Sequence, residues 1–264
     1  MSEWIAPPVL ALQFLTAVPV PLTVPAAPMH LGRSLAFFPV VGVLLGLALA
    51  ALDRALLLVL PVPVATALLL TAATALTGAL HLDGLMDTCD GVFGGRTPER
   101  RLEIMRDSRV GSYGALAGTL QLLLKYAALV SLPIEWRWIG LVLALTCGRW
   151  TMAAATWVFP YARAEGLGTA FKAGVTRPAI GAAAVLALAI AWVASHGLGV
   201  GLLVGATSVA WLVARYLCGK LGGLTGDCYG ALNEVVESTV LVGLVAMLAL
   251  GAPWLGRPDA VISR

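Results

Sequence analysis

The sequence predicts an all-α fold: a polytopic integral membrane helical bundle of about seven transmembrane helices, forming one domain over residues 1–264. Composition supports this prediction, because 59% of the residues are hydrophobic and only 12% are charged. A soluble domain is roughly 45–50% apolar and about 25% charged. The apolar residues also form long unbroken runs, unlike the short alternating segments of a membrane β-barrel. The composition therefore argues against a water-soluble fold and, more strongly, against a disordered chain.

Seven apolar stretches are long enough to cross a hydrocarbon core, which takes about 20 helical residues. They cover residues 35–52, 62–80, 113–132, 138–158, 178–195, 198–217 and 232–251. A count of six to eight remains open, because the first stretch continues past Asp53 towards residue 60. Residues 4–20 are interrupted by prolines and lack a basic start, which predicts an interfacial or re-entrant segment rather than a signal peptide. Small residues such as Gly42, Gly46 and Gly118 allow the helices to approach closely.

The basic residues predict the orientation of the chain in a cell inner (cytoplasmic) membrane. When the loops are assigned to alternate sides, eleven Lys and Arg residues fall on one side and four on the other. Basic loops stay in the cytoplasm, so we expect the N-terminus inside and the C-terminus outside. The three loops with distinctive polar residues, 81–112, 159–177 and 218–231, then share the cytoplasmic side. The net charge of +3 is made of scattered residues and does not indicate nucleic-acid binding.

The segment HLDGLMDTCDGVFGG and the residues after it contain regularly spaced carboxylates. The first three are spaced i, i+4, i+7 and share one helical face, where like charges repel each other. Oxygen ligands of this kind suit Mg²⁺, which also binds substrate phosphates. The expected metal ligands are Asp83, Asp87, Asp90, Glu103 and Asp107. A solvated acidic segment paired with the nearby arginines is an alternative, chiefly for Glu103.

Further candidate residues lie in the same loops and in the spans beside them. Arg109 and Arg106 flank Asp107 and could meet phosphate oxygens through two hydrogen bonds each. Arg149 is a lone arginine in an apolar span and needs a partner or a polar cavity. The catalytic candidates are Asp83, Asp87, His81 and Arg109. The substrate-binding candidates are Arg106, Arg149, Arg163, Lys172, Thr225, Asp227, Asn233 and Glu234.

His81 could be a general base, a hydrogen-bond partner or a polar residue at a helix end. The later loops are glycine-rich, and the last one precedes a helix start that could offer N–H groups to an anion. It lacks the GxxxxGK[ST] pattern of a P-loop.

Taken together, these motifs resemble the cobalamin synthase family, the adenosylcobinamide-GDP ribazoletransferases. The resemblance is based on ALQFLTAVPVP, HLDGLMDTCDG, RRLEIMRDSRVGSYG, GRW and GGLTGDCYGALNE, which occur in this order over nearly the whole chain. It implies a membrane transferase that requires Mg²⁺ and acts late in cobalamin (vitamin B12) biosynthesis. The substrates would be adenosylcobinamide-GDP and α-ribazole or its 5′-phosphate, with release of GMP. Contact with other enzymes of the pathway is a further possible partnership.

A mechanism follows from the resemblance as a hypothesis. Metal ions held by the carboxylates would bind the pyrophosphate, and the ribazole 3′-hydroxyl would attack the phosphorus next to the aminopropanol arm. Arg109 would stabilise the developing charge, and an aspartate or His81 would take the proton. Asp227 and Glu234 would either orient the second substrate or complete the metal shell.

Three other readings remain open. Asp87, Asp90 and Gly91, followed by Glu103 and Asp107, are similar to the motif of the CDP-alcohol phosphotransferases, although the Ala-Arg pair is missing and glutamate replaces an aspartate. A lipid head-group synthase of that type would use CDP-linked substrates. A polytopic transporter would carry charges near the bilayer midplane and inverted repeats. A membrane scaffold would leave the carboxylate spacing unexplained.

Overall fold

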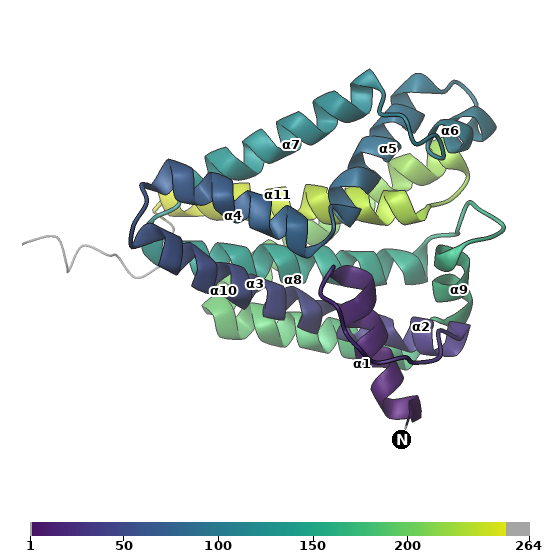
Figure 1. The fold of residues 1–264 in the computed structure, drawn as a ribbon, viewed down its shortest axis with the longest axis horizontal. Coiled ribbons are helices and arrows are strands. Elements are labelled where there is room, and N and C mark those ends of the chain that lie inside the picture. The colour runs from purple at the N-terminus through teal and green to yellow at the C-terminus, as the bar shows by residue number, and fades with distance from the viewer. Residues whose placement is uncertain (1, 252–264) are drawn as a thin grey trace, which may run out of the picture.

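The computed structural model describes residues 2–251, and residues 1 and 252–264 lie outside the described part. The described chain folds into helices joined by loops (Figure 1). The elements are α1 (Ser2–Leu15), α2 (Pro28–Ser34), the 3₁₀ helix η1 (Leu35–Phe37), α3 (Phe38–Leu57), α4 (Val62–Leu76), α5 (Leu80–Gly94), α6 (Pro98–Ile104), α7 (Ser112–Ser131), α8 (Ile134–Val158), α9 (Leu167–Gly174), α10 (Arg177–Leu221) and α11 (Gly226–Ala249). The all-α prediction is confirmed. The expected position of the C-terminus concerns residues outside the described part.

Five helical segments of the described chain are long and apolar enough to cross a membrane, and a bent pair of helices adds a sixth if it counts as one span. The five are Pro28–Leu57, α7, α8, α10 and α11, and the bent pair is α4 with α5. This tally is smaller than the expected seven. When the bent pair is counted, the difference lies in residues 178–217, which were expected as two spans and are counted as the single 45-residue helix α10.

α10 is nevertheless interrupted at Ser195 and His196, which have non-helical backbone angles. This break separates the two stretches that the sequence predicts there. A Cβ added to Gly199 would clash with the carbonyl of Ala191. In a straight helix these two residues would be two turns apart and could not touch, so the chain folds back at the break. The far end of α10 lies beside α6, because Arg101 donates a hydrogen bond to the Lys220 carbonyl at 3.0 Å. α10 therefore starts and finishes at the end of the bundle that holds α2, α6 and α9 (Figure 1).

Residues 62–80 do not form one straight span, as the hydropathy pattern had predicted. α4 ends at Leu76, and α5 departs from it at 86°. Gly78 and Ala79 both have positive φ angles, of 58° and 59°, which break the helix between them. Because of this bend, the start of α5 lies inside the bundle and its far end leads to the polar end of the molecule.

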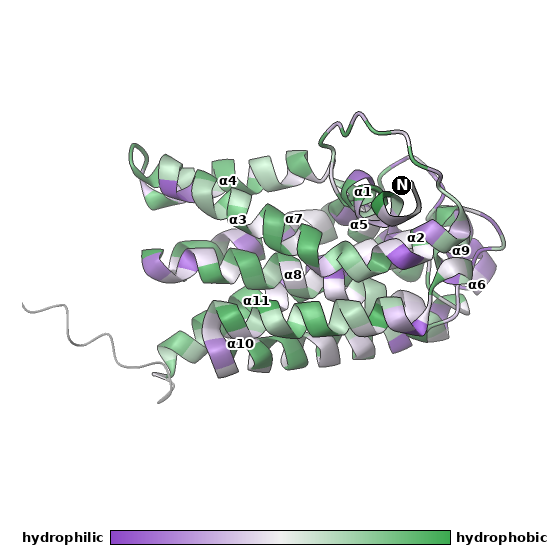
Figure 2. Cartoon of the chain, turned by 90° about the horizontal axis from the view of Figure 1, so that it is seen from below, coloured by the Kyte–Doolittle hydropathy of each residue, from purple (hydrophilic) through white to green (hydrophobic). Residues whose placement is uncertain are grey.

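α8 forms the centre of the bundle, since 89% of its most apolar stretch is buried. Its neighbour α3 approaches it through small residues. A Cβ added to Gly46 would lie only 2.7 Å from the Cα of Val142, and Gly42 is equally close to Leu145. The expected role of Gly42 and Gly46 in close packing is therefore confirmed. The outward faces of the long helices are hydrophobic, as a lipid environment requires (Figure 2).

Arg137 lies just before the predicted span 138–158, and the structure buries it completely at the start of α8. Its Nη2 is 2.5 Å from Asp53 Oδ1 on α3 and donates to Thr66 of α4. A buried guanidinium needs such partners, because an uncompensated charge in an apolar interior is very costly. This ion pair joins three helices where α3 ends and α8 begins.

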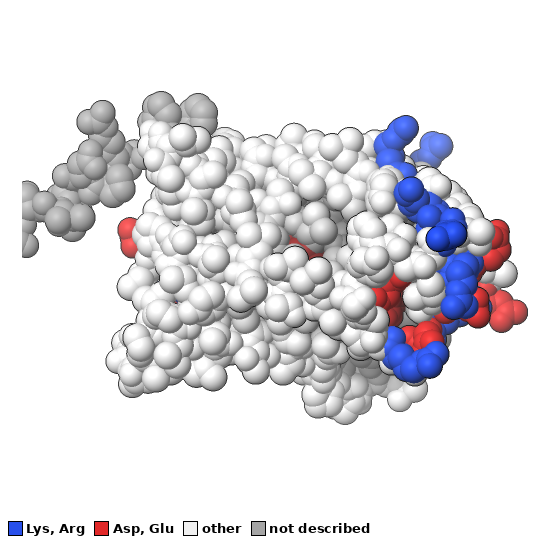
Figure 3. Space-filling view, turned by 90° about the horizontal axis from the view of Figure 1, so that it is seen from above, with Lys and Arg blue, Asp and Glu red and all other residues white. Residues whose placement is uncertain are grey.

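The N-terminal helix α1 is too short to count as a span, which agrees with the expected interfacial or re-entrant segment. Its Phe14 packs against Phe38 of α3 and Phe171 of α9, with ring centroids 6.0 and 4.9 Å away. On the face shown in Figure 3, Lys and Arg gather at the end that carries α5 and α6, with most of the visible acidic residues. This polar end is where the candidate site lies.

Candidate active site

The three polar loops predicted to share one site do meet at the polar end. The loop after α8 joins the loop before α11 through a bridge between Tyr161 and Leu224, in which the Ala162 N–H donates to the Leu224 carbonyl at 2.8 Å. α5 and α11 also touch through their backbones, since a Cβ on Gly84 would lie 2.7 Å from the carbonyl oxygen of Asp227. Segments more than a hundred residues apart in the sequence thus form one surface.

Three aspartates gather at this contact, and we call Asp83, Asp87 and Asp227 the acidic cluster. Asp83 and Asp87 lie one turn apart on α5, as their spacing predicts, and Asp227 joins them from the start of α11. Charge repulsion acts on Asp87 from both of the other members, and the opposing cation is Arg163. Arg163 donates to Asp227 Oδ2 at 2.8 Å. Three carboxylates near one guanidinium leave an excess of negative charge within the acidic cluster.

Asp90, which the sequence predicts as a metal ligand, forms hydrogen bonds to backbone amides in the structure. It is only 8% exposed, and its two carboxylate oxygens accept hydrogen bonds from the N–H groups of Gly111 and Gly114, each at 2.8 Å. These are amides at the start of α7, which have no partner within their own helix. A side chain on either glycine would clash with the carboxylate. Asp90 therefore anchors α7 to α5.

Glu103 and Asp107 are exposed and paired with arginines, which is the solvated alternative that the sequence left open. Glu103 lies 2.7 Å from Arg100, and Asp107 lies 2.6 Å from Arg109. The hydrogen bonds from Arg109 lower the pKa of Asp107 to about 2. Arg109 and Arg106 are themselves exposed to solvent.

The predicted set of five metal ligands is consequently not assembled. Among residues 2–251, no three His, Cys, Asp or Glu side chains are close enough together to hold a metal ion by themselves. Asp83 and Asp87 stay together on α5. Their new neighbour is Asp227, which the sequence placed among the substrate-binding candidates.

Two other substrate-binding candidates stabilise helix ends. Thr225 is the N-cap of α11, and its hydroxyl accepts from the Cys228 N–H at 3.3 Å. Lys172 donates to the carbonyls of Thr156 and Trp157 at the end of α8, at 2.9 and 2.8 Å. Burial lowers the pKa of the Lys172 ammonium. Both residues hold the loops that surround the site.

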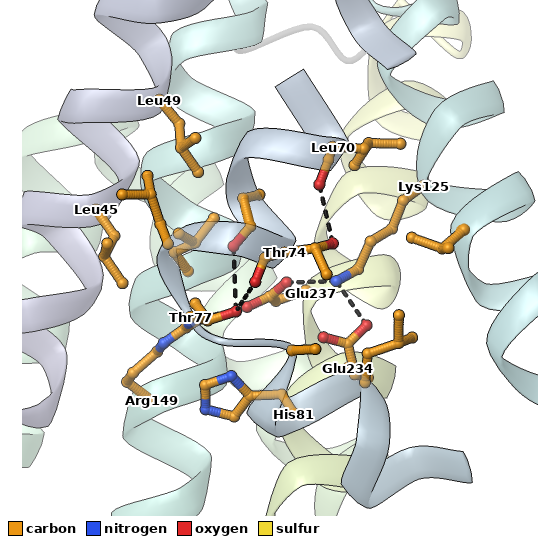
Figure 4. A pocket seen from close by; sticks show the side chains of 16 residues that line it. Leu45, Leu49, Leu70, Thr74, Thr77, His81, Lys125, Arg149, Glu234 and Glu237 are labelled. Atoms are coloured by element: carbon orange, nitrogen blue, oxygen red, sulfur yellow. Dashed lines mark hydrogen bonds and ion pairs between the residues drawn. The ribbon is translucent and has the colours of Figure 1, made fainter. Parts of the chain in front are cut away.

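The candidates Arg149, Asn233 and Glu234 lie deeper, in a buried charged cluster between α7, α8 and α11. Figure 4 shows Arg149 and Glu234 in this cluster with Lys125 and Glu237. Lys125 of α7 is 2.7 Å from Glu234 and 2.5 Å from Glu237. Arg149 also pairs with Glu237, and Asn233 donates to the same carboxylate at 2.9 Å. Two cations therefore balance two carboxylates inside the apolar bundle.

Lys125 and Glu237 were not among the predicted site residues. The sequence did contain a signal, because the spans hold two isolated cations and the last span holds two carboxylates. Charges inside a membrane almost always pair. Charge balance could therefore have predicted the cluster, although the choice of partners depends on how the helices pack.

His81 connects the charged cluster with a second feature, a cavity of about 240 Å³ beside the acidic cluster. His81 is 2% exposed, and its Nε2 has no hydrogen-bond partner among the described residues. Asp83, Arg163 and Asp227 also line this cavity. Five aromatic residues contribute further lining: Phe14, Phe38, Tyr161, Phe171 and Tyr229. We call it the aromatic cavity.

The fold and the site together define a polytopic helical membrane protein whose polar end presents carboxylate oxygens next to an enclosed aromatic cavity. A profile of the family described as cobalamin-5-phosphate synthase matches residues 8–245. The chain belongs to this family.

Curated relatives carry the name adenosylcobinamide-GDP ribazoletransferase. The protein of Syntrophobacter fumaroxidans is 44% identical, over 90% of this chain and 97% of its own length. The protein of Pseudomonas fluorescens is 43% identical, over 89% and 97% of the two chains. That of Geotalea daltonii is 39% identical, over 90% and 96%. No solved structure matches the chain.

Proposed function

We propose that this chain is an adenosylcobinamide-GDP ribazoletransferase of cobalamin biosynthesis. It transfers the adenosylcobinamide-phosphate group from adenosylcobinamide-GDP to α-ribazole or α-ribazole 5′-phosphate, and GMP is released. The observation that carries this proposal is the match to the family over residues 8–245, together with relatives about 40% identical over nearly their full length. The acidic cluster supplies a site suited to this chemistry at the polar end.

The residues of the acidic cluster fit Mg²⁺, because their donors are all carboxylate oxygens and outnumber the cation beside them. Mg²⁺ is usually bound through one or two carboxylates, with waters and substrate phosphates completing its shell. A ready-made cage of protein ligands is therefore not required. Asp83 and Asp87 would hold the ion, with Asp227 beside them. When bound, it neutralises charge on the pyrophosphate of the donor.

The remaining groups of the site bind and orient the substrates. Arg163, held by Asp227, is placed to contact a phosphate oxygen of the donor. The acceptor hydroxyl oxygen forms a bond to the phosphorus that carries the corrin arm, while the bond to the leaving GMP oxygen breaks. A carboxylate of the acidic cluster takes the hydroxyl proton. Displacements of this kind are accelerated mainly by positioning and electrostatics.

We place the polar end on the cytoplasmic side of the inner membrane. The Lys and Arg residues gather there, and basic segments remain in the cytoplasm. The other readings of the sequence receive less support. The buried charges that a transporter would need are paired with one another. Asp90, which is central to the similarity with CDP-alcohol phosphotransferases, binds backbone amides instead.

The test is GMP release by purified, detergent-solubilised protein supplied with both substrates and Mg²⁺. Asp83→Asn and Asp87→Asn should each reduce turnover at least about 100-fold, since they remove charge from the acidic cluster. Asp107→Asn is the matched control, because this aspartate is exposed and pairs with Arg109. Removal of Mg²⁺ by a chelator should stop the reaction, and its addition should restore it. Folded wild-type protein that joins no product from this substrate pair would refute the proposal.

A further inference from the structure

The aromatic cavity has two walls that come from different parts of the chain. On one wall, Phe171 of α9 packs against Phe14 and Phe38, with ring centroids 4.9 and 6.0 Å away. On the other, Tyr161 and Tyr229 stack with centroids 6.4 Å apart and an angle of 22° between their rings. Walls of this kind favour a flat aromatic ligand, since stacked and edge-to-face contacts between rings contribute binding free energy beyond that of the buried area.

Three residues that line the cavity, His81, Arg163 and Tyr229, each have a buried polar atom without a hydrogen-bond partner in the described chain. The Nε2 of His81 is buried and has no hydrogen bond within the described chain. Buried polar atoms nearly always have a partner, so this atom is suited to a group that arrives with a ligand. A neutral imidazole provides one donor and one acceptor. A ring nitrogen in an otherwise apolar base would satisfy it.

The acidic cluster lies at the edge of the same cavity, since Asp83 and Asp227 belong to its lining. A ligand whose flat base enters the cavity therefore places its attached sugar next to these carboxylates. Of the groups in the proposed reaction, the corrin macrocycle is far too large for about 240 Å³. Guanine is also flat, but its edge carries several hydrogen-bond donors and acceptors, whereas one wall of the cavity consists of the apolar rings of Phe14, Phe38 and Phe171.

We propose that the aromatic cavity binds the base of the nucleoside acceptor, a flat and largely apolar benzimidazole-type heterocycle, and directs its ribose towards the acidic cluster. This inference rests on the proposed function and adds the position of the acceptor. In this arrangement the Phe171 side and the Tyr161 side enclose the base, and His81 lies within reach of its ring nitrogen. The acceptor hydroxyl then faces the carboxylates that take its proton.

The test measures binding of α-ribazole alone to the purified full-length protein, followed by the fluorescence of its base, without donor. Phe171→Leu should raise its Kd about three- to tenfold, the loss expected when one aromatic contact is removed. Tyr161 is half-buried on the opposite wall, and Tyr161→Leu should raise the Kd for α-ribazole by a similar factor. It is the second variant if Phe171→Leu folds poorly. Phe159→Leu is the matched control, because this buried phenylalanine packs against Trp211 outside the cavity.

Steady-state kinetics separate this inference from the proposed function. The two cavity variants should raise the KM for the acceptor and leave the KM for adenosylcobinamide-GDP unchanged. An increase confined to the donor KM would overturn the inference and indicate that guanine occupies the cavity, while the transferase activity stands. Unchanged acceptor binding in both variants would also overturn it. Wild-type protein that binds α-ribazole but forms no product would instead contradict the proposed function.

His81 gives an independent readout. If it pairs with the ring nitrogen, His81→Phe should raise the acceptor KM, and His81→Gln, which retains a donor and an acceptor, should restore part of the affinity. A lower kcat at unchanged acceptor KM would show that His81 does not contact the base.

Discussion

Among single residues, Asp83, Asp87 and Asp90 show how a regular helical spacing can conceal different surroundings. All three lie on α5, yet Asp90 uses both oxygens to hold the N–H groups of Gly111 and Gly114. Asp83 and Asp87 have no such bonds in the described chain and share their surroundings with Asp227. The difference comes from the neighbouring start of α7, a contact that the local sequence does not reveal.

Asp90→Ala should therefore destabilise the fold, whereas Asp87→Asn should affect catalysis. The alanine variant leaves the half-buried Gly111 amide and the buried Gly114 amide without an acceptor. A buried unsatisfied group costs about 1–3 kcal/mol. We expect a clearly lower Tm in detergent for Asp90→Ala and a nearly unchanged Tm for Asp87→Asn, measured by thermal denaturation. Equal stability of the two variants would mean that Asp90 is not the anchor of α7.

The two arginines that could contact phosphate differ in the same way. Arg163 is half-buried between the aromatic cavity and Asp227, whereas the side chain of Arg109 is 87% exposed and paired with Asp107. Arg163→Gln should lower kcat/KM about 10- to 100-fold, the usual effect of losing a charged hydrogen bond. Arg109→Gln should change it less than about threefold. Similar losses in both variants would restore the role that the sequence assigned to Arg109.

At the scale of helices, the site depends on the contact between α5 and α11. Gly84 allows this contact, and so does Gly230 on α11, where an added Cβ would lie 3.1 Å from the carbonyl oxygen of His81. The distance between the two helices thus sets where Asp227 lies relative to Asp83 and Asp87. A change at the helix contact should affect the reaction without touching any carboxylate.

Gly84→Ala tests this dependence. Its Cβ would lie 2.7 Å from the Asp227 carbonyl oxygen, so α5 and α11 must separate. We expect at least about a tenfold loss of kcat, because small displacements in a site reduce positioning strongly. Gly205→Ala on α10 is the control, since its Cβ would meet open space and alanine favours a helix by about 1 kcal/mol. Full activity of Gly84→Ala would show that the spacing of α5 and α11 is not critical.

Helix predictions from the sequence succeed where the signal is local. The stretches 113–132 and 138–158 agree with α7 and α8, because continuous apolar runs give the spans directly. The bend between α4 and α5 was missed, since Gly78 and Ala79 are small apolar residues that also fit inside a span. Nothing in their identity predicts the left-handed angles that the surrounding packing imposes.

The candidate site was predictable only in part for the same reason. Motif spacing predicted Asp83 and Asp87, and the distribution of basic residues predicted that the three loops share one side of the membrane. The position of Asp227 beside them, and the pairing of Lys125 with Glu237, depend on contacts between helices far apart in the sequence. Such pairings require the three-dimensional packing of α5, α7 and α11.

For the whole molecule, the positions of both ends of α10 determine how the chain crosses the membrane. If its two arms each span the bilayer, the break at His196 lies on the side opposite the acidic cluster. In a variant lacking the native cysteines, His196→Cys should react with a membrane-impermeant maleimide added to intact spheroplasts. Arg106→Cys, exposed near the acidic cluster, should react only after the membrane is permeabilised.

Labelling of both cysteines from the outside would mean that α10 does not return across the bilayer, and labelling of Arg106→Cys alone would place the acidic cluster outside the cell. The expected pattern puts the reaction in the compartment that supplies Mg²⁺ and nucleotide-activated substrates, with GMP released into the same space.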